Sequence, residues 1–222
     1  MIKAVFMDYT GTTVYESEKE MNEIAMRICK NSKFTDTQDV LKTWKETMEQ
    51  YDNKSYKESY LNGDEIVERT LQDFTRLFQL EENLSELQSL VQEAWRNVSV
   101  FDDVPPFYEA ISVPIYIVSN NRIQYIENAI KKNNLTPAGI VCADMVRAYK
   151  PRAELFEKAL EISGCRPEEV LHIGDSFHAD VQGASQVGIK PVLIQRNSNC
   201  TYENTTIVKN LLEVLPLLKT TN

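Results

Sequence analysis

The stretch that decides the fold is residues 3–12, which read KAVFMDYTGT. It opens with a short apolar run up to Met7, without strict alternation of polar and apolar residues, as expected of a strand buried on both faces. Asp8 follows directly, and Gly11 then marks a turn. The stretch therefore predicts a buried strand with a carboxylate at its C-terminal tip.

The alternation of short apolar runs and helical patterns resumes after residue 100. Four further strands are predicted, at Pro114–Val118, Gly139–Cys142, Val170–Ile173 and Pro191–Ile194. Helices are predicted at about Pro106–Ile111, Ile123–Asn133, Glu154–Ser163, Ala179–Val187 and Val208–Leu218. Repeated strand–helix alternation predicts an α/β fold, a Rossmann-like parallel sheet core with helices on both faces.

Residues 15–99 have a different composition, with one glycine, no proline and many Glu, Gln, Lys and Leu residues. Four amphipathic helices are predicted there, at about Glu18–Asn31, Asp36–Tyr51, Asp64–Leu80 and Leu84–Asn97. We therefore expect an inserted helical-bundle domain at 15–99 and a core domain made of 1–14 and 100–222. Because the insertion follows the first strand, we expect it to lie over the C-terminal edge of the sheet, where open α/β sheets bind ligands.

Charge and cysteine content narrow the class of partner. The chain of 222 residues carries a net charge of −9, which disfavours binding to nucleic acid or to an anionic membrane. Its four cysteines are far apart, so neither a zinc site nor a redox motif is expected. The absence of a secretory signal or a membrane-length apolar run predicts a cytoplasmic protein. The oligomeric state stays open.

Two polar motifs follow the first two strands of the predicted core. Asp8 ends the first strand, although alone it would be read as a simple turn starter. Ser119, Asn120 and Asn121 follow the second strand near a helix start, where a hydroxyl and amide groups make a plausible anion seat. The alternative for this second motif is a helix N-cap.

Two more motifs lie further along. Proline after Lys150 keeps that lysine in an extended segment just before a helix. Asp175 stands at the tip of the strand that ends at Ile173, and Asp180 lies in the first turn of the next helix. Two carboxylates facing one point suit Mg²⁺, which takes few protein ligands. Taken singly, Lys150 reads as a surface charge and Asp180 as a helix-dipole partner.

Together the four motifs resemble those of the haloacid dehalogenase-like hydrolase superfamily, whose members can carry a helical cap after the first motif. The resemblance implies that Asp8 is the nucleophile and forms an aspartyl-phosphate, that Ser119 bonds the transferring phosphoryl group, and that Lys150 neutralises charge. It also implies a Mg²⁺ site formed by Asp175 and Asp180, the Asp8 carboxylate and the Thr10 main-chain carbonyl. The implied activity is a Mg²⁺-dependent phosphatase acting on a small phosphorylated metabolite, a phosphoric monoester hydrolase.

One position departs from the family pattern. Most phosphatases of the superfamily carry a second Asp two residues after the nucleophile, which protonates the leaving group and activates water, but this chain has Thr10. General acid–base catalysis is therefore in doubt, and Glu16 or Glu18 could supply the missing group. In the insertion, Lys54 and Lys57 are candidates for binding an acidic substrate, although a helix connector often has this composition.

Three alternatives stay open. A haloacid dehalogenase would use Asp8 to attack carbon and needs no metal, which the pair Asp175 and Asp180 disfavours. A phosphonoacetaldehyde hydrolase would need a cap lysine, for which Lys54 is the candidate. A degenerate member would bind a phosphorylated ligand without turnover. His172, within a buried strand pattern, is read as a core histidine.

Overall fold

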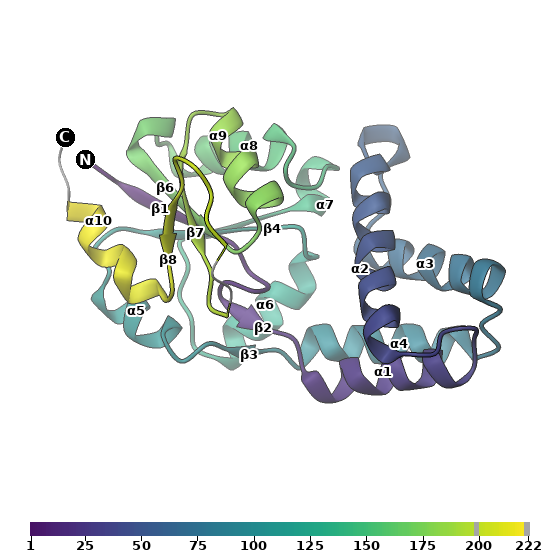
Figure 1. The fold of residues 1–222 in the computed structure, drawn as a ribbon. Coiled ribbons are helices and arrows are strands. Elements are labelled where there is room, and N and C mark those ends of the chain that lie inside the picture. Colours follow the sequence, from purple (N-terminus) through teal and green to yellow (C-terminus); the bar gives the residue numbers. More distant parts are fainter. Residues whose placement is uncertain (198–199, 220–222) are drawn as a thin grey trace. The chain divides into compact units, whose positions relative to one another are not determined.

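The computed structural model describes residues 1–197 and 200–219 (Figure 1). The chain divides into two compact units, Met1–Tyr15 with Val100–Asn222, called here the sheet unit, and Glu16–Ser99, called the helical unit. Strands β2 (Val14–Tyr15) and β3 (Ser99–Val100), where the chain leaves and re-enters the sheet unit, form a separate two-stranded sheet.

The sheet unit is built on six strands in the order β5-β4-β1-β6-β7-β8. Their bounds are β1 Ala4–Met7, β4 Ile115–Ser119, β5 Gly139–Cys142, β6 Val170–Gly174, β7 Lys190–Ile194 and β8 Thr206–Val208. Every pairing among them is parallel, which confirms the predicted α/β sheet. Met7 lies beside both Ile117 and Ile173, so the residues that follow β1, β4 and β6 meet at one edge.

Helices cover both faces of this sheet (Figure 1). On one face lie α5 (Val104–Ala110), α6 (Ile123–Lys132) and the C-terminal α10 (Leu215–Lys219). On the other lie α8 (Ala153–Ser163) and α9 (Gly183–Gln186), while the short α7 (Ala143–Val146) follows β5. This arrangement follows from right-handed crossovers, which place helices on opposite faces when the chain moves in opposite directions across the sheet. All four residues of β1 are buried, as expected for a central strand.

The C-terminal segment differs from its prediction as one helix over Val208–Leu218. Thr206–Val208 form the edge strand β8, a 3₁₀ turn covers Leu211–Val214, and α10 begins only at Leu215. The β-branched residues at 206–208 fit a pleated edge beside β7. Pro216 has no N–H to give, which suits it to the first turn of a helix and not to the middle of a long one.

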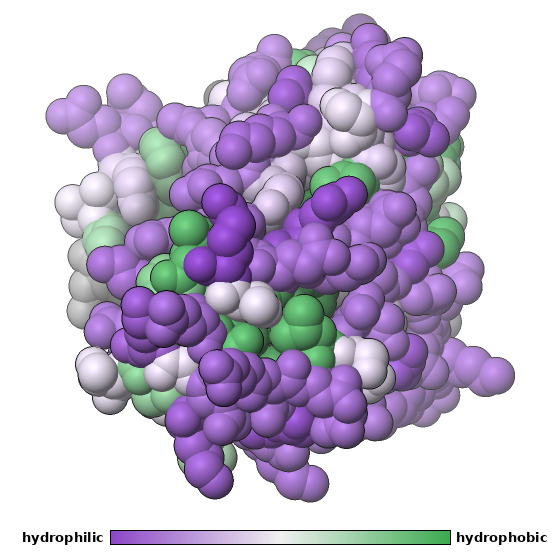
Figure 2. All heavy atoms as spheres, turned by 90° about the vertical axis from the view of Figure 1, so that its right-hand side faces the viewer, coloured by the Kyte–Doolittle hydropathy of each residue, from purple (hydrophilic) through white to green (hydrophobic). Residues whose placement is uncertain are grey.

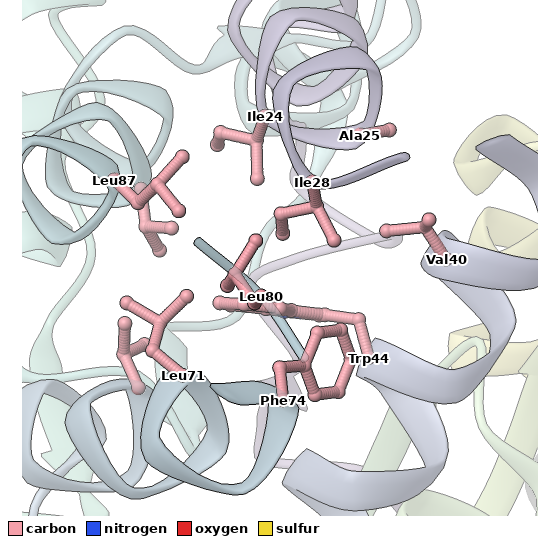
Figure 3. Packing of buried hydrophobic residues seen from close by; sticks show 11 residues of the cluster. Ile24, Ala25, Ile28, Val40, Trp44, Leu71, Phe74, Leu80 and Leu87 are labelled. Carbon is pink, nitrogen blue, oxygen red and sulfur yellow. The ribbon is translucent and has the colours of Figure 1, made fainter. Parts of the chain in front are cut away.

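The helical unit contains α1 (Glu18–Lys30), α2 (Thr37–Lys54), α3 (Gly63–Phe78) and α4 (Leu84–Arg96), with a 3₁₀ turn at Lys57–Ser59. Their buried side chains meet in one cluster, in which the rings of Trp44 and Phe74 pack edge to face with centroids 5.9 Å apart (Figure 3). Asn62 caps the start of α3 with a capping box. The Asn62 side chain accepts a hydrogen bond from Glu65 N, and the Glu65 carboxylate accepts one from the main-chain N–H of Asn62. The bundle therefore has a core of its own.

Helix α2 runs three residues beyond the predicted end at Tyr51, through Lys54. It stops where Ser55 turns to extended backbone, and the Ser55 hydroxyl accepts from Leu61 N at 2.6 Å and donates to Leu61 O at 3.0 Å. These two bonds close the connector to α3. Lys54 is thus a helix-end residue, and Lys57 lies in the short 3₁₀ turn.

No helix among the described residues is long and apolar enough to cross a membrane. The face of the molecule in Figure 2 is covered mostly by hydrophilic side chains, with apolar side chains in small groups, which is ordinary for a folded protein surface.

Candidate active site

The turn after β1 presents Asp8 at the sheet edge. Its N–H donates to Ile173 O at 2.9 Å, and its own carbonyl accepts from Thr13 Oγ1 at 2.6 Å. Gly11 has φ +87°, and a Cβ there would lie about 2.5 Å from the carboxylate of Asp175. Only glycine lets this turn approach Asp175 so closely.

Lys150 is buried and reaches the same edge from the segment before α8. Its Nζ donates to Asp8 Oδ1 at 2.5 Å, to Asp180 Oδ1 at 2.6 Å and to Val118 O at 3.0 Å. An ammonium has three hydrogens, so these contacts use all of them. Burial disfavours the charged ammonium, but the two carboxylates outweigh that effect and raise the pKa of Lys150.

Asp180 lies in a π-helical turn, Phe177–Gln182, and not in the regular first helical turn that the sequence predicts. Three donors converge on it: Lys150 Nζ and His172 Nε2 on Oδ1, and Ser176 N on Oδ2. Burial alone would raise the pKa of Asp180, but Lys150 and His172 hold it below its usual range. A Cβ on Gly174 would lie 2.1 Å from the Asp180 carboxyl carbon, so a glycine is needed at that point.

Asp175 completes a group of acids. One ligand oxygen each from Asp8, Asp175 and Asp180 all lie within 4.8 Å of one another, with Asp175 exposed and the other two buried. Thr12 Oγ1 donates to Asp175 Oδ1 at 3.3 Å. Burial raises the pKa of Asp8 to about 7 despite its bond to Lys150. Three carboxylates thus lie close together, and only those of Asp8 and Asp180 contact the Lys150 ammonium. A hard divalent cation fits the excess of oxygen charge.

The two hydroxyls of the site meet at one amide. Ser119, at the end of β4, and Thr10, after β1, both donate to Asn121 Oδ1, at 3.0 and 3.1 Å. The neighbouring Asn120 uses its side chain differently. Its Oδ1 accepts from Lys150 N at 2.7 Å and its Nδ2 donates to Lys150 O at 3.4 Å. Asn120 therefore fixes the main chain of Lys150, and both ends of its amide are used.

The sheet unit brings together most of the residues that the sequence singles out, namely Asp8, Thr10, Ser119, Asn120, Lys150, Asp175 and Asp180. Lys54 and Lys57 belong to the helical unit, and the Lys57 ammonium lies 4.9 Å from the centroid of its own neighbour Tyr56. In the same unit, Glu16 accepts from Trp95 Nε1 at 3.1 Å, and burial raises the pKa of Glu16.

Sequence reasoning did not predict the contacts that two side chains make with these groups. Asn121 belongs to the polar triplet after β4, but an amide's partners cannot be read from its position in a sequence. His172 is buried in β6, as a core histidine should be, yet its Nε2 lies 2.9 Å from Asp180 Oδ1. Only the π-helical turn that carries Asp180 back over β6 makes this contact.

The model of the haloacid dehalogenase-like hydrolase family matches residues 2–188, and the chain belongs to this family of hydrolases. The chain is 25% identical over 185 residues to (S)-2-haloacid dehalogenase 4A of Burkholderia cepacia, covering 79% of each chain. It is 37% identical over 76 residues to glyceraldehyde 3-phosphate phosphatase of Methanothermobacter thermautotrophicus, a match that covers 34% of this chain and about a third of the relative.

Solved structures show the same fold. The L-2-haloacid dehalogenase of Xanthobacter autotrophicus superposes with a TM-score of 0.81 at 18% identity over the whole of both chains. A HAD phosphatase of Thermococcus onnurineus superposes with a TM-score of 0.67 at 22% identity over 98% of both. Relatives of both chemistries share this architecture, so the reaction has to be argued from the site.

Proposed function

We propose that the protein is a Mg²⁺-dependent phosphatase that acts on a small phosphorylated metabolite through an aspartyl-phosphate on Asp8, with the helical unit as its cap. The observation that carries the proposal is the group of three carboxylates, of Asp8, Asp175 and Asp180, of which only Asp8 and Asp180 are paired with the ammonium of Lys150. An anionic phosphate cannot approach such a group unless a cation offsets its charge, because like charges a few ångströms apart repel strongly at a poorly solvated site.

The residues that would hold the cation are Asp8, Asp175, Asp180 and the main-chain carbonyl of Thr10. Asp8 and Asp175 have the better claim to direct contact, because both oxygens of Asp180 already accept hydrogen bonds from the protein. Bound Mg²⁺ supplies positive charge beside the nucleophile and the phosphoryl oxygens. It also favours the ionised form of Asp8, whose pKa burial raises to about 7.

The chain's own groups then divide the work. An Asp8 carboxylate oxygen attacks phosphorus, a new O–P bond forms, the bond from phosphorus to the leaving oxygen breaks, and that oxygen takes a proton from solvent. Water then attacks the phosphorus of the aspartyl-phosphate, the bond from Asp8 to phosphorus breaks, and the proton of the water passes to solvent, which returns Asp8 and releases inorganic phosphate. Lys150 holds Asp8 in place and offsets charge at the buried end of the site, while Ser119 lies at the neighbouring strand tip.

Dehalogenation is the second candidate, and one observation favours it. Thr10 replaces the acid that protonates a leaving group in most phosphatases of the family, and a departing halide needs no proton. The similarity to the B. cepacia dehalogenase over 79% of the chain points the same way. Against it, a substrate carboxylate would have to enter a site that already holds three carboxylates and one ammonium.

One experiment separates these reactions. The purified protein is incubated with an aryl phosphate, an acyl phosphate, a panel of sugar phosphates, phosphonoacetaldehyde and a 2-haloacid, each with Mg²⁺ and with EDTA. We expect phosphate release from phosphate esters with Mg²⁺ only. Halide release in EDTA would assign the dehalogenase reaction. Turnover of phosphonoacetaldehyde alone would assign phosphonoacetaldehyde hydrolysis. Phosphate binding without turnover of any compound would indicate a ligand-binding member.

A further inference from the structure

Asn121 bridges the tips of two strands at the candidate site. Its Oδ1 lies 3.0 Å from Ser119 Oγ and 3.1 Å from Thr10 Oγ1, and its main-chain N–H donates to Ser119 Oγ at 3.1 Å. Ser119 ends β4 and Thr10 follows β1, so one carboxamide connects both segments beside Asp8. The bridge has no counterpart in the roles that the family resemblance assigns.

In the structure the oxygen end of the Asn121 amide faces the two hydroxyls. Ser119 Oγ accepts the main-chain N–H of Asn121, so its own proton is available to an acceptor, and Asn121 Oδ1 is that acceptor. Thr10 donates its proton to the same oxygen. The amide nitrogen Nδ2 therefore points away from both hydroxyls, and no described residue accepts from it.

This nitrogen is not among the fully buried polar atoms that lack a partner in the described residues, so it keeps some contact with solvent. The other side-chain donors beside Asp8 are engaged. The Lys150 ammonium donates its three hydrogens to Asp8, Asp180 and Val118 O. The hydroxyls of Thr10 and Ser119 both donate to Asn121 Oδ1. An amide that Thr10 and Ser119 hold, with two unused N–H groups, is thus left at the neighbouring tips of β1 and β4.

We propose that Asn121 is a substrate-binding residue whose Nδ2 donates a hydrogen bond to an oxygen of the phosphoryl group that Asp8 attacks. The proposal rests on the proposed function for the identity of that group. A phosphoryl group presents several anionic oxygens, and oriented donors that need no reorganisation stabilise such charge effectively. Thr10 and Ser119 supply the orientation, since both hold the far end of the same amide.

The test compares two variants that separate donation from positioning. Asn121→Asp keeps an oxygen that accepts from Thr10 and Ser119 but replaces the N–H donor with an anionic oxygen. Asn121→Ala removes both. Asn134→Asp, at an exposed left-handed position just after α6, adds the same charge away from the strand tips and serves as the control. All three are assayed for melting temperature, for binding of inorganic phosphate with Mg²⁺ by calorimetry, and for kcat/KM on an aryl phosphate.

We expect phosphate affinity and kcat/KM to fall about 10- to 100-fold in both Asn121 variants, the range for losing a hydrogen bond to a charged group, with the control unchanged. Wild-type values in Asn121→Asp with a loss only in Asn121→Ala would mean that Asn121 merely positions the hydroxyls, which overturns the proposal.

Mg²⁺-dependent turnover by the wild type that Asn121→Asp retains in full overturns the role of Asn121 while leaving the phosphatase function intact. Phosphate binding that depends on Asn121 without turnover of any ester supports it and removes the phosphatase function. A wild type that binds no phosphate overturns both.

Discussion

Asp8 and Lys150 form a buried ion pair in which Nζ lies 2.5 Å from Oδ1, with the two side chains 10% and 3% exposed. The pair alone does not keep Asp8 fully ionised near pH 7, because burial still raises the pKa of Asp8 to about 7. Lys150 is shared with Asp180, so its single charge is divided between two carboxylates. A further positive charge at this site would favour the ionised Asp8 that the proposed mechanism uses at neutral pH.

Replacing Lys150 by Met should abolish turnover and destabilise the fold. Two buried carboxylates would lose their shared partner, and breaking a buried pair in this way costs about 3–5 kcal/mol of unfolding free energy. Chemical denaturation and turnover on an aryl phosphate measure the two effects. Lys158→Met, which removes a surface pair with Glu161, is the control and should shift stability by less than about 1 kcal/mol. Full turnover in Lys150→Met would remove Lys150 from the proposed mechanism.

Asp175→Ala and Asp180→Ala should fail in different ways. Asp175 is exposed and makes no ion pair with any described residue, so its loss should weaken Mg²⁺ binding with little change in stability. Asp180→Ala removes the acceptor of Lys150, His172 and Ser176 N, and should lower the melting temperature. Calorimetric titration with Mg²⁺ and thermal unfolding separate the two. Equal loss of Mg²⁺ affinity in both variants, with unchanged stability, would contradict this division.

Mg²⁺ binding should strengthen as the pH rises. With a pKa of about 7 in the metal-free protein, Asp8 is mostly protonated near pH 6 and mostly ionised near pH 8, which predicts about a tenfold gain in affinity over that range. Asp8→Asn should remove this gain. The same raised pKa makes a contribution to stability that is present at low pH and is lost as the pH rises through about 7. Calorimetric titrations with Mg²⁺ at several pH values in the wild type and in Asp8→Asn test this prediction. An equal pH dependence of the Mg²⁺ affinity in Asp8→Asn would assign that dependence to another group.

Thr10→Asp should raise steady-state turnover, most of all on esters with poor leaving groups. A positioned general acid or base contributes roughly 100- to 10,000-fold to such steps, and a threonine hydroxyl whose proton is bonded to Asn121 Oδ1 supplies neither. The wild type should therefore accumulate phosphoenzyme and favour activated aryl phosphates. Turnover along a series of aryl phosphates, in both proteins, gives the comparison. A slower variant and no accumulated intermediate in the wild type would mean that Glu16 or Glu18 already supplies the base.

The parallel sheet could be predicted because each buried strand is a short apolar run bounded by turn residues, and β1, with four buried residues, is the plainest case. The candidate acids followed from the same reasoning, since Asp8 and Asp175 stand directly after such runs and parallel strands end at one edge. Strand β8 was not predicted because it has only three residues, Thr206–Val208. The polar–apolar pattern of so short a strand is weaker than the apolar helical periodicity that follows it.

The finer organisation of the site depends on contacts between distant residues. The sequence places Asn121 in a polar triplet at a helix start, but it gives no sign of the contact with Thr10, 111 positions earlier. His172 reads as core until the π-helical turn at Phe177–Gln182 brings Asp180 back over β6. Periodicity reports burial and secondary structure, whereas the partner of a buried polar atom is set by tertiary packing.

The most direct measurement of the central claim is to trap the covalent intermediate. Protein is mixed with a radiolabelled acyl phosphate, quenched in acid and mapped by peptide. The account predicts label on the peptide that carries Asp8 when Mg²⁺ is present, and none in EDTA or in Asp8→Asn, which should stay folded because the amide is nearly isosteric but is not a nucleophile. Phosphatase turnover that persists in Asp8→Asn, or halide release from a 2-haloacid in EDTA with no labelled protein, would contradict it.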